Sequence, residues 1–172
     1  MQADTQKLNQ PGPVDTAMLR RVCGHFVTGV TVITSGSGAQ AAGTTVNSFT
    51  SVSLDPALVL ICLHNDSRLR PIVEGTGAYV VNFLSAQQEV LARKFAAKAT
   101  ASLRDVAHHP SATGTPVLDD ALGFLSCRVV SATEVGDHTI FVSEVVDMGL
   151  PTRFEQPLVF FRGALRALQE AL

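Results

Sequence analysis

The chain has 172 residues, of which 46% are hydrophobic and 16% charged, and its formal net charge at pH 7 is −2. This length fits one core, and the apolar content excludes a disordered chain. The charge, with no cluster of Lys and Arg, excludes the basic surface typical of nucleic-acid binding. The longest apolar run, Leu58 to Leu63, is far shorter than the roughly 20 residues that span a bilayer. No secretion signal opens the chain, so we expect a cytoplasmic protein with a flexible tail over residues 1–14 and a single domain over residues 15–172.

The cysteines agree with this compartment. Cys23, Cys62 and Cys127 are odd in number, widely spaced and set in apolar stretches. This pattern excludes a disulfide framework and a paired zinc motif, so buried free thiols are expected. The low charge beside an ordinary apolar content favours a second chain over part of the surface, as in a homodimer.

The first third of the chain reads as a helix followed by strands. Asp15 or Thr16 can cap a short helix. Its apolar face is formed at helical spacing by Met18, Leu19, Val22 and Phe26. The β-branched residues 28–35 and the stretch 41–49 predict a hairpin, because a Gly-Ser-Gly turn separates them. A Ser-rich stretch leads to the apolar run 57–63, which is typical of a strand buried on both faces.

The rest of the chain predicts further strands with short helices between them. A helical piece near 71–74 precedes a strand over 78–84. Ser85 and Gln88 match a capping box that opens a helix through Lys98. Its inward side chains are predicted to be Val90, Leu91 and Phe95. Residues 99–117 look irregular. Three strands are then expected over 122–135, 138–148 and 157 to about 168.

Six or seven strands therefore dominate, with two or three short helices. No regular alternation of strand and helix appears, and turns join most neighbouring strands. This indicates a mostly β, antiparallel barrel rather than a doubly wound sheet.

Several familiar active-site motifs are absent from the sequence. No GxGxxG follows a strand, and neither a P-loop nor a GxSxG nucleophile turn is present. His108-His109 precedes a proline in the irregular stretch, where a solvated loop is a better interpretation than a metal site.

Three polar segments remain as candidate sites, although each also fits an ordinary loop, turn or strand face. Residues 43–53 combine a glycine with alternating hydroxyl and amide side chains, an edge that a flat ring can approach closely. Residues 64–68 follow the apolar strand with a serine and an arginine, which suit a phosphate. Residues 136–138 hold a histidine on a Gly-Asp turn between two strands.

In this order, the segments resemble the short-chain flavin reductase family, the reductase components of two-component flavin-dependent monooxygenases. The resemblance runs through residues 26–34, 47–56, 136–138 and 157–163, and covers about 16–165. It implies a dimeric FMN-binding split barrel that reduces FAD or FMN with NADH or NADPH. The reduced flavin would pass to a separate monooxygenase. The absence of an arginine pair near the Gly-Asp turn favours NADH.

The resemblance also assigns roles to residues. The isoalloxazine and ribityl chain would be lined by Gly43, Thr44, Thr45, Asn47 and Ser48. The flavin phosphate would be held by residues 62–68, among them Cys62 and chiefly Ser67 and Arg68, while the aromatic and small pair beside the flavin would be Phe95 and Ala96. The nicotinamide nucleotide would be bound by Gly136, Asp137 and His138, with the late strand closing over the site through Phe161 and Arg162.

Two positions depart from the family pattern. Members commonly carry tyrosine where this chain has Leu165, and often at the position of Phe161. Both changes remove a hydroxyl from the expected nicotinamide pocket. No catalytic acid or base is needed, because hydride passes directly between the two cofactors when they are held face to face. His138 would position the nucleotide, and main-chain N–H groups around Thr45 to Asn47 would face the developing charge on the flavin.

Two other functions stay open on the sequence. The first is a flavin-binding protein on the same barrel that stores or senses flavin without turnover. The second is a barrel related to pyridoxamine-phosphate oxidases or to haem-handling proteins. The Gly-Asp-His turn favours the reductase over a storage protein, which has no use for a dinucleotide.

Overall fold

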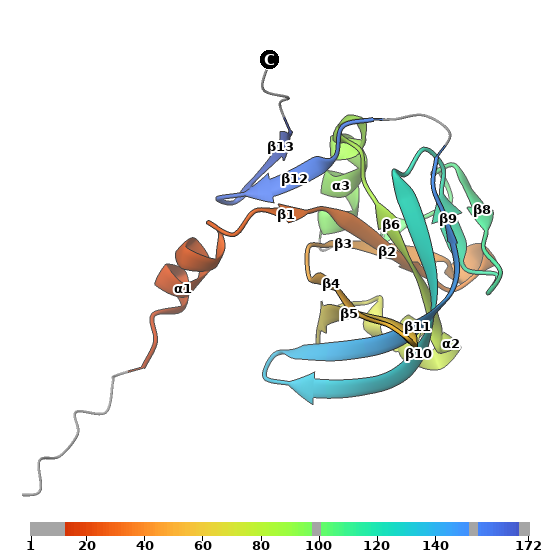
Figure 1. Cartoon of the computed structure of the whole chain (residues 1–172), viewed down its shortest axis with the longest axis horizontal. Helices are drawn as coiled ribbons and strands as arrows, with labels where there is room; N and C mark the ends of the chain where they lie inside the picture. The colour runs from red at the N-terminus through yellow and green to blue at the C-terminus, as the bar shows by residue number, and fades with distance from the viewer. Residues whose placement is uncertain (1–12, 98–100, 152–154, 169–172) are drawn as a thin grey trace, which may run out of the picture.

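The computed structural model describes residues 13–97, 101–151 and 155–168 (Figure 1). The helices are α1 Thr16–Cys23, α2 Arg70–Thr76 and α3 Glu89–Ala96, with 3₁₀ turns η1 Gly38–Gln40 and η2 Ala86–Gln88. The strands are β1 Thr28–Gly29, β2 Thr31–Ser35, β3 Ala42–Val46, β4 Phe49–Leu54, β5 Ala57–His64, β6 Ala78–Phe83, β7 Ala101–Ser102, β8 His108–Pro110, β9 Pro116–Leu118, β10 Gly123–Val135, β11 His138–Gly149, β12 Leu158–Phe161 and β13 Ala164–Ala167.

The largest sheet curls into the body of the molecule. Its strand order is β4-β5-β11-β10-β6-β2-β3-β7, and every neighbouring pair is antiparallel. β3 and β4 follow one another in the chain yet do not pair, which leaves the barrel split between them. A smaller sheet, β1-β12-β13, extends from the barrel together with α1 (Figure 1). The predicted mostly β, antiparallel barrel is confirmed.

The predicted strand over 28–35 is two strands in different sheets. β1 pairs with β12 in the small sheet, whereas β2 pairs with β3 and β6 in the large one. The chain changes sheets at Val30, which is buried although it belongs to neither strand. The stretch 157–168 is similarly a hairpin of β12 and β13 rather than one strand. β-propensity marks a segment as extended but does not distinguish a crossing between sheets.

The Ser-rich segment after β3 is a strand in its own right. It forms β4, an edge strand paired with β5 in the large sheet. Hydroxyl side chains suit this place because one face of an edge strand meets solvent. Residues 101–118, predicted to be irregular, contribute the short strands β7, β8 and β9.

β5 is buried on one face only, contrary to the prediction. Val59, Ile61 and Leu63 point into the barrel and are at most 4% exposed. The residues between them, Leu58, Leu60 and Cys62, are half-buried on the outer face. The continuous apolar run therefore gives β5 two apolar faces, and this chain buries only the inner face.

Two packed cores hold the fold together. One lies inside the barrel, where Ile33, Ile61, Tyr79 and Phe141 are fully buried. The other lies under α3 and includes Phe95. Asn82 on β6 links β2 to β9, since its Nδ2 donates to the carbonyl of Val32 (3.0 Å) and its Oδ1 accepts from the amide of Leu118 (2.8 Å).

The predicted N-terminal helix is present, but its apolar face is not covered. The Asp15 side chain accepts a hydrogen bond from the amide of Ala17 at 2.9 Å, as a cap should. The side chains of its apolar face are all at least half exposed: Met18, Leu19, Val22 and Phe26. Residues 1–12 of the predicted tail lie outside the described residues.

The helix before Lys98 begins as predicted and ends early. Ser85 and Gln88 form both hydrogen bonds of the capping box, opening the turn η2 that continues as α3. α3 ends at Ala96, and Lys98 lies outside the described residues. Phe95 is buried and Leu91 half-buried, but Val90 is 81% exposed, so its predicted inward placement is wrong.

The three thiols are free but not equally buried. Cys127 is buried, Cys62 is half-buried and Cys23 is exposed, so only the first fully matches the prediction. Burial raises the pKa of the Cys127 thiol to about 12. Within the described residues, no helix has both the length and the apolar character needed to cross a membrane.

Candidate functional site

The first part of the candidate site is the contact between β3 and the end of α3. Gly43 has no side chain, and a Cβ placed there would lie 2.9 Å from Cε1 of Phe95. Thr45 adds a second tie, because its hydroxyl donates to the carbonyl of Ala92 at 2.7 Å. The space over Gly43, expected to admit a flat ligand, is thus taken by the Phe95 ring. Ala96, next to that ring, is exposed.

The second part is the break between β3 and β4, where the barrel is split. The Asn47 side chain donates to the hydroxyl of Thr28 at 3.1 Å. Ser48 is tied to β5: its hydroxyl donates to the carbonyl of Cys62 (2.8 Å) and accepts from the amide of the same residue (3.2 Å). Asn47 and Ser48 lie between β3 and β4 and belong to neither strand. Main-chain groups at this break are the part of the barrel wall that a ligand with acceptor atoms could approach.

The third part is the loop after β5. The Ser67 amide donates to the carbonyl of His64 at 2.8 Å, and the Ser67 hydroxyl accepts from the amide of Leu69 at 3.3 Å. A hydroxyl that accepts one hydrogen bond can still donate another, so Ser67 is a candidate donor to a ligand. Arg68 beside it is exposed. A hydroxyl and a guanidinium in one tight loop fit an anionic group such as a phosphate.

The fourth part is the turn between β10 and β11. Gly136 has a φ of 62°, which glycine adopts without strain. Nδ1 of His138 donates to Oδ1 of Asp137 at 2.7 Å, and this hydrogen bond lowers the pKa of the Asp137 carboxyl. His64 Nε2 lies 3.8 Å from the other carboxylate oxygen. One carboxylate thus lies between two imidazoles.

The third and fourth parts form one continuous surface, although the sequence separates them by about 70 residues. His64 ends β5 and stands opposite His138, which begins β11. Their rings meet edge to face with centroids 5.1 Å apart. No local sequence pattern encodes the pairing of β5 with β11, so the contact between the two segments follows only from the tertiary structure.

Comparison with known proteins assigns this arrangement to a family. The family described as Flavin reductase like domain matches residues 23–169. The chain belongs to the flavin reductase family. The reductase component of a 4-nitrophenol 4-monooxygenase/4-nitrocatechol 2-monooxygenase from Rhodococcus opacus is 37% identical over 163 residues, or 95% of this chain and 86% of the relative. The resemblance inferred from the sequence is confirmed.

Solved structures agree with the fold. The NADH:FAD oxidoreductase of Streptomyces globisporus, in complex with NAD and FAD fragments, has a TM-score of 0.84 at 37% identity and covers 90% of this chain and 93% of that one. The flavin reductase component of a bacterial two-component tryptophan halogenase has a TM-score of 0.84 at 33% identity, covering 91% of this chain and 100% of that one. The split barrel expected from the family is therefore the fold of this chain.

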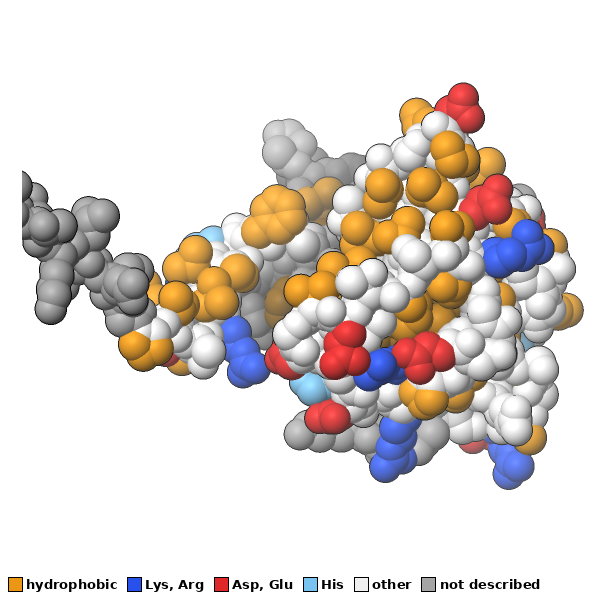
Figure 2. Space-filling view, turned by 90° about the horizontal axis from the view of Figure 1, so that it is seen from below, with side chains coloured by type: hydrophobic (Ala, Val, Ile, Leu, Met, Phe, Trp, Pro, Cys, Tyr) orange, Lys and Arg blue, Asp and Glu red, His pale blue; other side chains and the backbone are white. Residues whose placement is uncertain are grey.

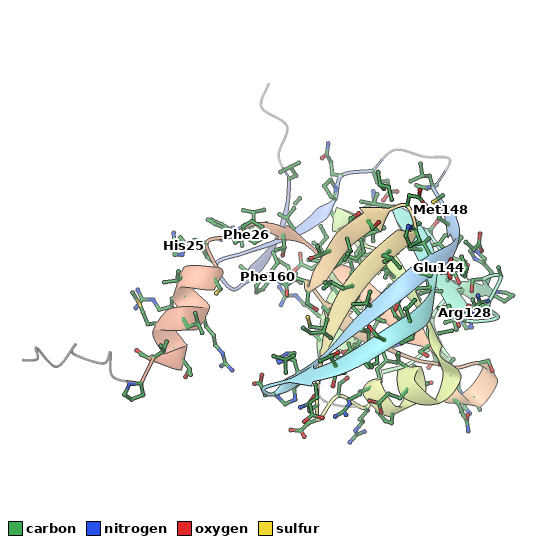
Figure 3. All side chains as sticks on the ribbon, turned by 60° about the horizontal axis from the view of Figure 1, so that its bottom comes forward. His25, Phe26, Arg128, Glu144, Met148 and Phe160 are labelled. Atoms are coloured by element: carbon green, nitrogen blue, oxygen red, sulfur yellow. The ribbon has the colours of Figure 1, made fainter. Side chains whose placement is uncertain are left out.

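Two residues that the flavin reductase family pattern assigns to the site lie on the small sheet. The ring of Phe161 meets the His25 ring edge to face at 6.1 Å, and the amide of Arg162 donates to the carbonyl of Gly24 at 2.7 Å. Both contacts join the β12–β13 turn to the end of α1. Figure 3 shows the neighbouring side chains of His25, Phe26 and Phe160 on this arm, away from Glu144 on β11. Within this chain the arm is thus a separate element from the Gly136–His138 turn.

Other parts of the molecule contribute little to a site. Nδ1 of His109 lies 2.8 Å from the Asp119 carboxylate, and His108 contacts the carbonyl of Val106. Across residues 13–97, 101–151 and 155–168, no three His, Cys, Asp or Glu side chains are grouped for a metal ion. A surface hollow of about 650 Å³ beside α2 is lined by residues such as Ala42, Ile72 and Ser102, and by none of the predicted site residues.

Proposed function

We propose that this chain is the reductase component of a two-component flavin-dependent system, oxidising NADH and reducing free FAD or FMN for a separate monooxygenase. The likeness to the solved NADH:FAD oxidoreductase carries this function, since it extends over nine-tenths of the chain. Relatives named for NADH-dependent reduction of FAD and of FMN support the same activity and favour NADH over NADPH. The flavin and the nicotinamide supply the redox chemistry themselves, so the protein's task is binding and orientation.

The flavin ring is assigned to the break between β3 and β4. The main-chain amides around Thr45 to Asn47 suit a ring that carries acceptor atoms, and they would face the charge that develops on reduction. Thr44 and Thr45 are assigned to the flavin site from opposite faces of β3, and Gly43 contributes by seating Phe95. Ser67 and Arg68, with Cys62 in the same stretch, are assigned to the flavin phosphate, and Ala96 is assigned beside the flavin.

The nicotinamide nucleotide is assigned to the turn Gly136–His138. The hydrogen bond to Asp137 holds the His138 imidazole in one orientation, with Nε2 left to meet the nucleotide. Phe161 and Arg162 would close over the site from the small sheet. Because that sheet is a separate arm, this closure is best supplied from a second copy of the chain.

A homodimer is the form we propose for the active protein. The outer face of β5 and β11 carries half-buried apolar side chains on neighbouring strands: Leu58, Leu60, Cys62, Ile140 and Val142. Figure 2 shows hydrophobic side chains on this side of the barrel and on α1. Covering both surfaces by a second copy would remove the apolar area that one chain leaves exposed. Analytical ultracentrifugation should give twice the chain mass, and a monomer at micromolar concentration would contradict the proposal.

The cytoplasm is the compartment we propose for this reaction. The three cysteines are free, including Cys23 on the surface, which suits a reducing environment. Detection of the activity in a cytosolic fraction, and not in an extracellular or membrane fraction, would support this placement.

The activity is tested by following NADH absorbance under air with FAD or FMN in excess. We expect continuous NADH oxidation, faster than with NADPH. No turnover with any of the four combinations, together with tight flavin binding, would instead favour the storage protein. His138→Ala should raise the KM for NADH more than the KM for flavin, and the opposite order would contradict the assignment of the turn.

A further inference from the structure

Asn65 is the residue that joins the two nucleotide-binding segments. Its amide N–H donates to the carbonyl of Asp137 at 2.9 Å. Its side-chain Nδ2 donates to the carbonyl of Gly136 at 3.2 Å, and its Oδ1 accepts from the hydroxyl of Thr139 at 2.9 Å. Three hydrogen bonds from one half-buried residue thus reach both turn residues and the residue after His138.

The chemistry of these bonds suits asparagine. The same short side chain offers a donor to one carbonyl and an acceptor to one hydroxyl, and its amide places them on two separate atoms, Nδ2 and Oδ1. Aspartate at this position would face the Gly136 carbonyl with an acceptor, and alanine would leave the buried Thr139 hydroxyl without its partner. The hydrogen bond from the Asn65 amide N–H to the Asp137 carbonyl does not involve the Asn65 side chain. A substitution at position 65 affects this bond only if the loop moves.

The turn closes the β10–β11 hairpin between the paired residues Val135 and His138, and His138 also pairs with His64 on β5. Gly136 and Asp137 are exposed, and an added Cβ on Gly136 would meet no atom within 4 Å. Asp137 is the partner that orients the imidazole of His138. Strand pairing fixes the main chain of His138, and the peptide planes of Gly136 and Asp137 set the position of the Asp137 carboxylate that orients the imidazole. Asn65 holds the carbonyls of both turn residues from the loop after β5.

We propose that Asn65 is a positioning residue for the nicotinamide nucleotide, holding the Gly136–His138 turn so that the His138 imidazole is presented to NADH. This inference rests on the proposed reductase function. The loop assigned to the flavin phosphate and the turn assigned to NADH lie together because Asn65, three residues before Arg68 in that loop, forms hydrogen bonds to the turn. Asn65 itself need not touch either nucleotide.

The test compares Asn65→Ala and Thr139→Val with the matched control Thr76→Val. Thr139→Val keeps the buried shape and removes only the hydroxyl that donates to Asn65. Thr76→Val removes a hydroxyl with equally good bonds, to the carbonyl of Ile72 at 2.9 Å, at the end of α2 and outside the assigned site. Each variant is measured for melting temperature, for kcat and for both KM values.

Two readouts separate positioning from a general loss of stability. We expect Asn65→Ala to raise the KM for NADH about tenfold and Thr139→Val about threefold, with kcat and the flavin KM changing less. The double variant should match Asn65→Ala alone, since Thr139 acts through Asn65. Hydrogen exchange at the amides of residues 136–139 should accelerate in both variants and not in Thr76→Val, whose KM values should stay unchanged.

Each outcome decides the inference. Unchanged exchange in the turn, an unchanged KM for NADH, or a larger effect on the flavin KM would overturn the positioning role while the reductase function stands. If Asn65→Ala does not fold, Thr139→Val decides on the same criteria, because its substitution is isosteric. A wild-type chain that oxidises no NADH with either flavin would instead refute the reductase function and the inference together.

Discussion

Gly43→Ala tests how closely β3 and α3 are packed. The new Cβ would lie 2.9 Å from Cε1 and 3.0 Å from Cδ1 of Phe95, whose side chain is 1% exposed. The ring has little space to move into, and overpacking of this kind costs about 1–3 kcal/mol. Replacing glycine also lowers the entropy of the unfolded chain, which returns about 0.4–1 kcal/mol. We expect a net loss of about 1–2 kcal/mol, or a melting temperature lower by about 2–8 °C.

The control is Gly29→Ala on β1, where an added Cβ would meet nothing within 4 Å. This variant should be as stable as the wild type or slightly more stable, because only the entropy contribution remains. Urea unfolding at one fixed protein concentration measures both variants, which removes any effect of dimerisation.

A second change distinguishes a steric clash from other effects of the alanine. Phe95→Leu removes the ring atoms that the new Cβ would meet, so adding it to Gly43→Ala should cost less than the sum of the two single losses, by about 1 kcal/mol. Equal stability of Gly43→Ala and Gly29→Ala, or strict additivity of the pair, would refute the close contact between β3 and α3.

Three further results are expected. Asn82→Ala should lower the free energy of unfolding by about 2–4 kcal/mol in urea titrations, because it removes three hydrogen bonds and leaves buried partners unpaired. At pH 8 a thiol reagent should label Cys23 quickly and Cys127 only on unfolding, since burial raises the pKa of the latter to about 12. The hydrogen bond from His138 lowers the pKa of the Asp137 carboxyl below its usual 3.8. The ionised carboxylate therefore stabilises the fold above pH 3.8, and this contribution is lost as the pH falls through the lowered pKa. Acid unfolding of Asp137→Asn should consequently be less steep below pH 4 than that of the wild type.

Local sequence patterns determined the elements whose evidence lies within a few residues. The Asp15 cap, the capping box that starts at Ser85 and the hairpin between β2 and β3 follow from short-range hydrogen bonds and turn preferences, and the structure contains all three. Alternating and continuous apolar runs similarly predicted most strands of the barrel. The order of four family-like segments was enough to identify the flavin reductase family.

Only the tertiary structure decided which faces are covered and which loops meet. An apolar run indicates that a strand avoids water, but not whether its own chain or another covers it. For this reason β5 was expected to be buried on a face that this chain leaves open, and the apolar face of α1 is also exposed. The pairing of β5 with β11 brings Asn65 to the Gly136–His138 turn across more than 70 positions of sequence. Contacts of this kind depend on the register of distant strands, which no local periodicity encodes.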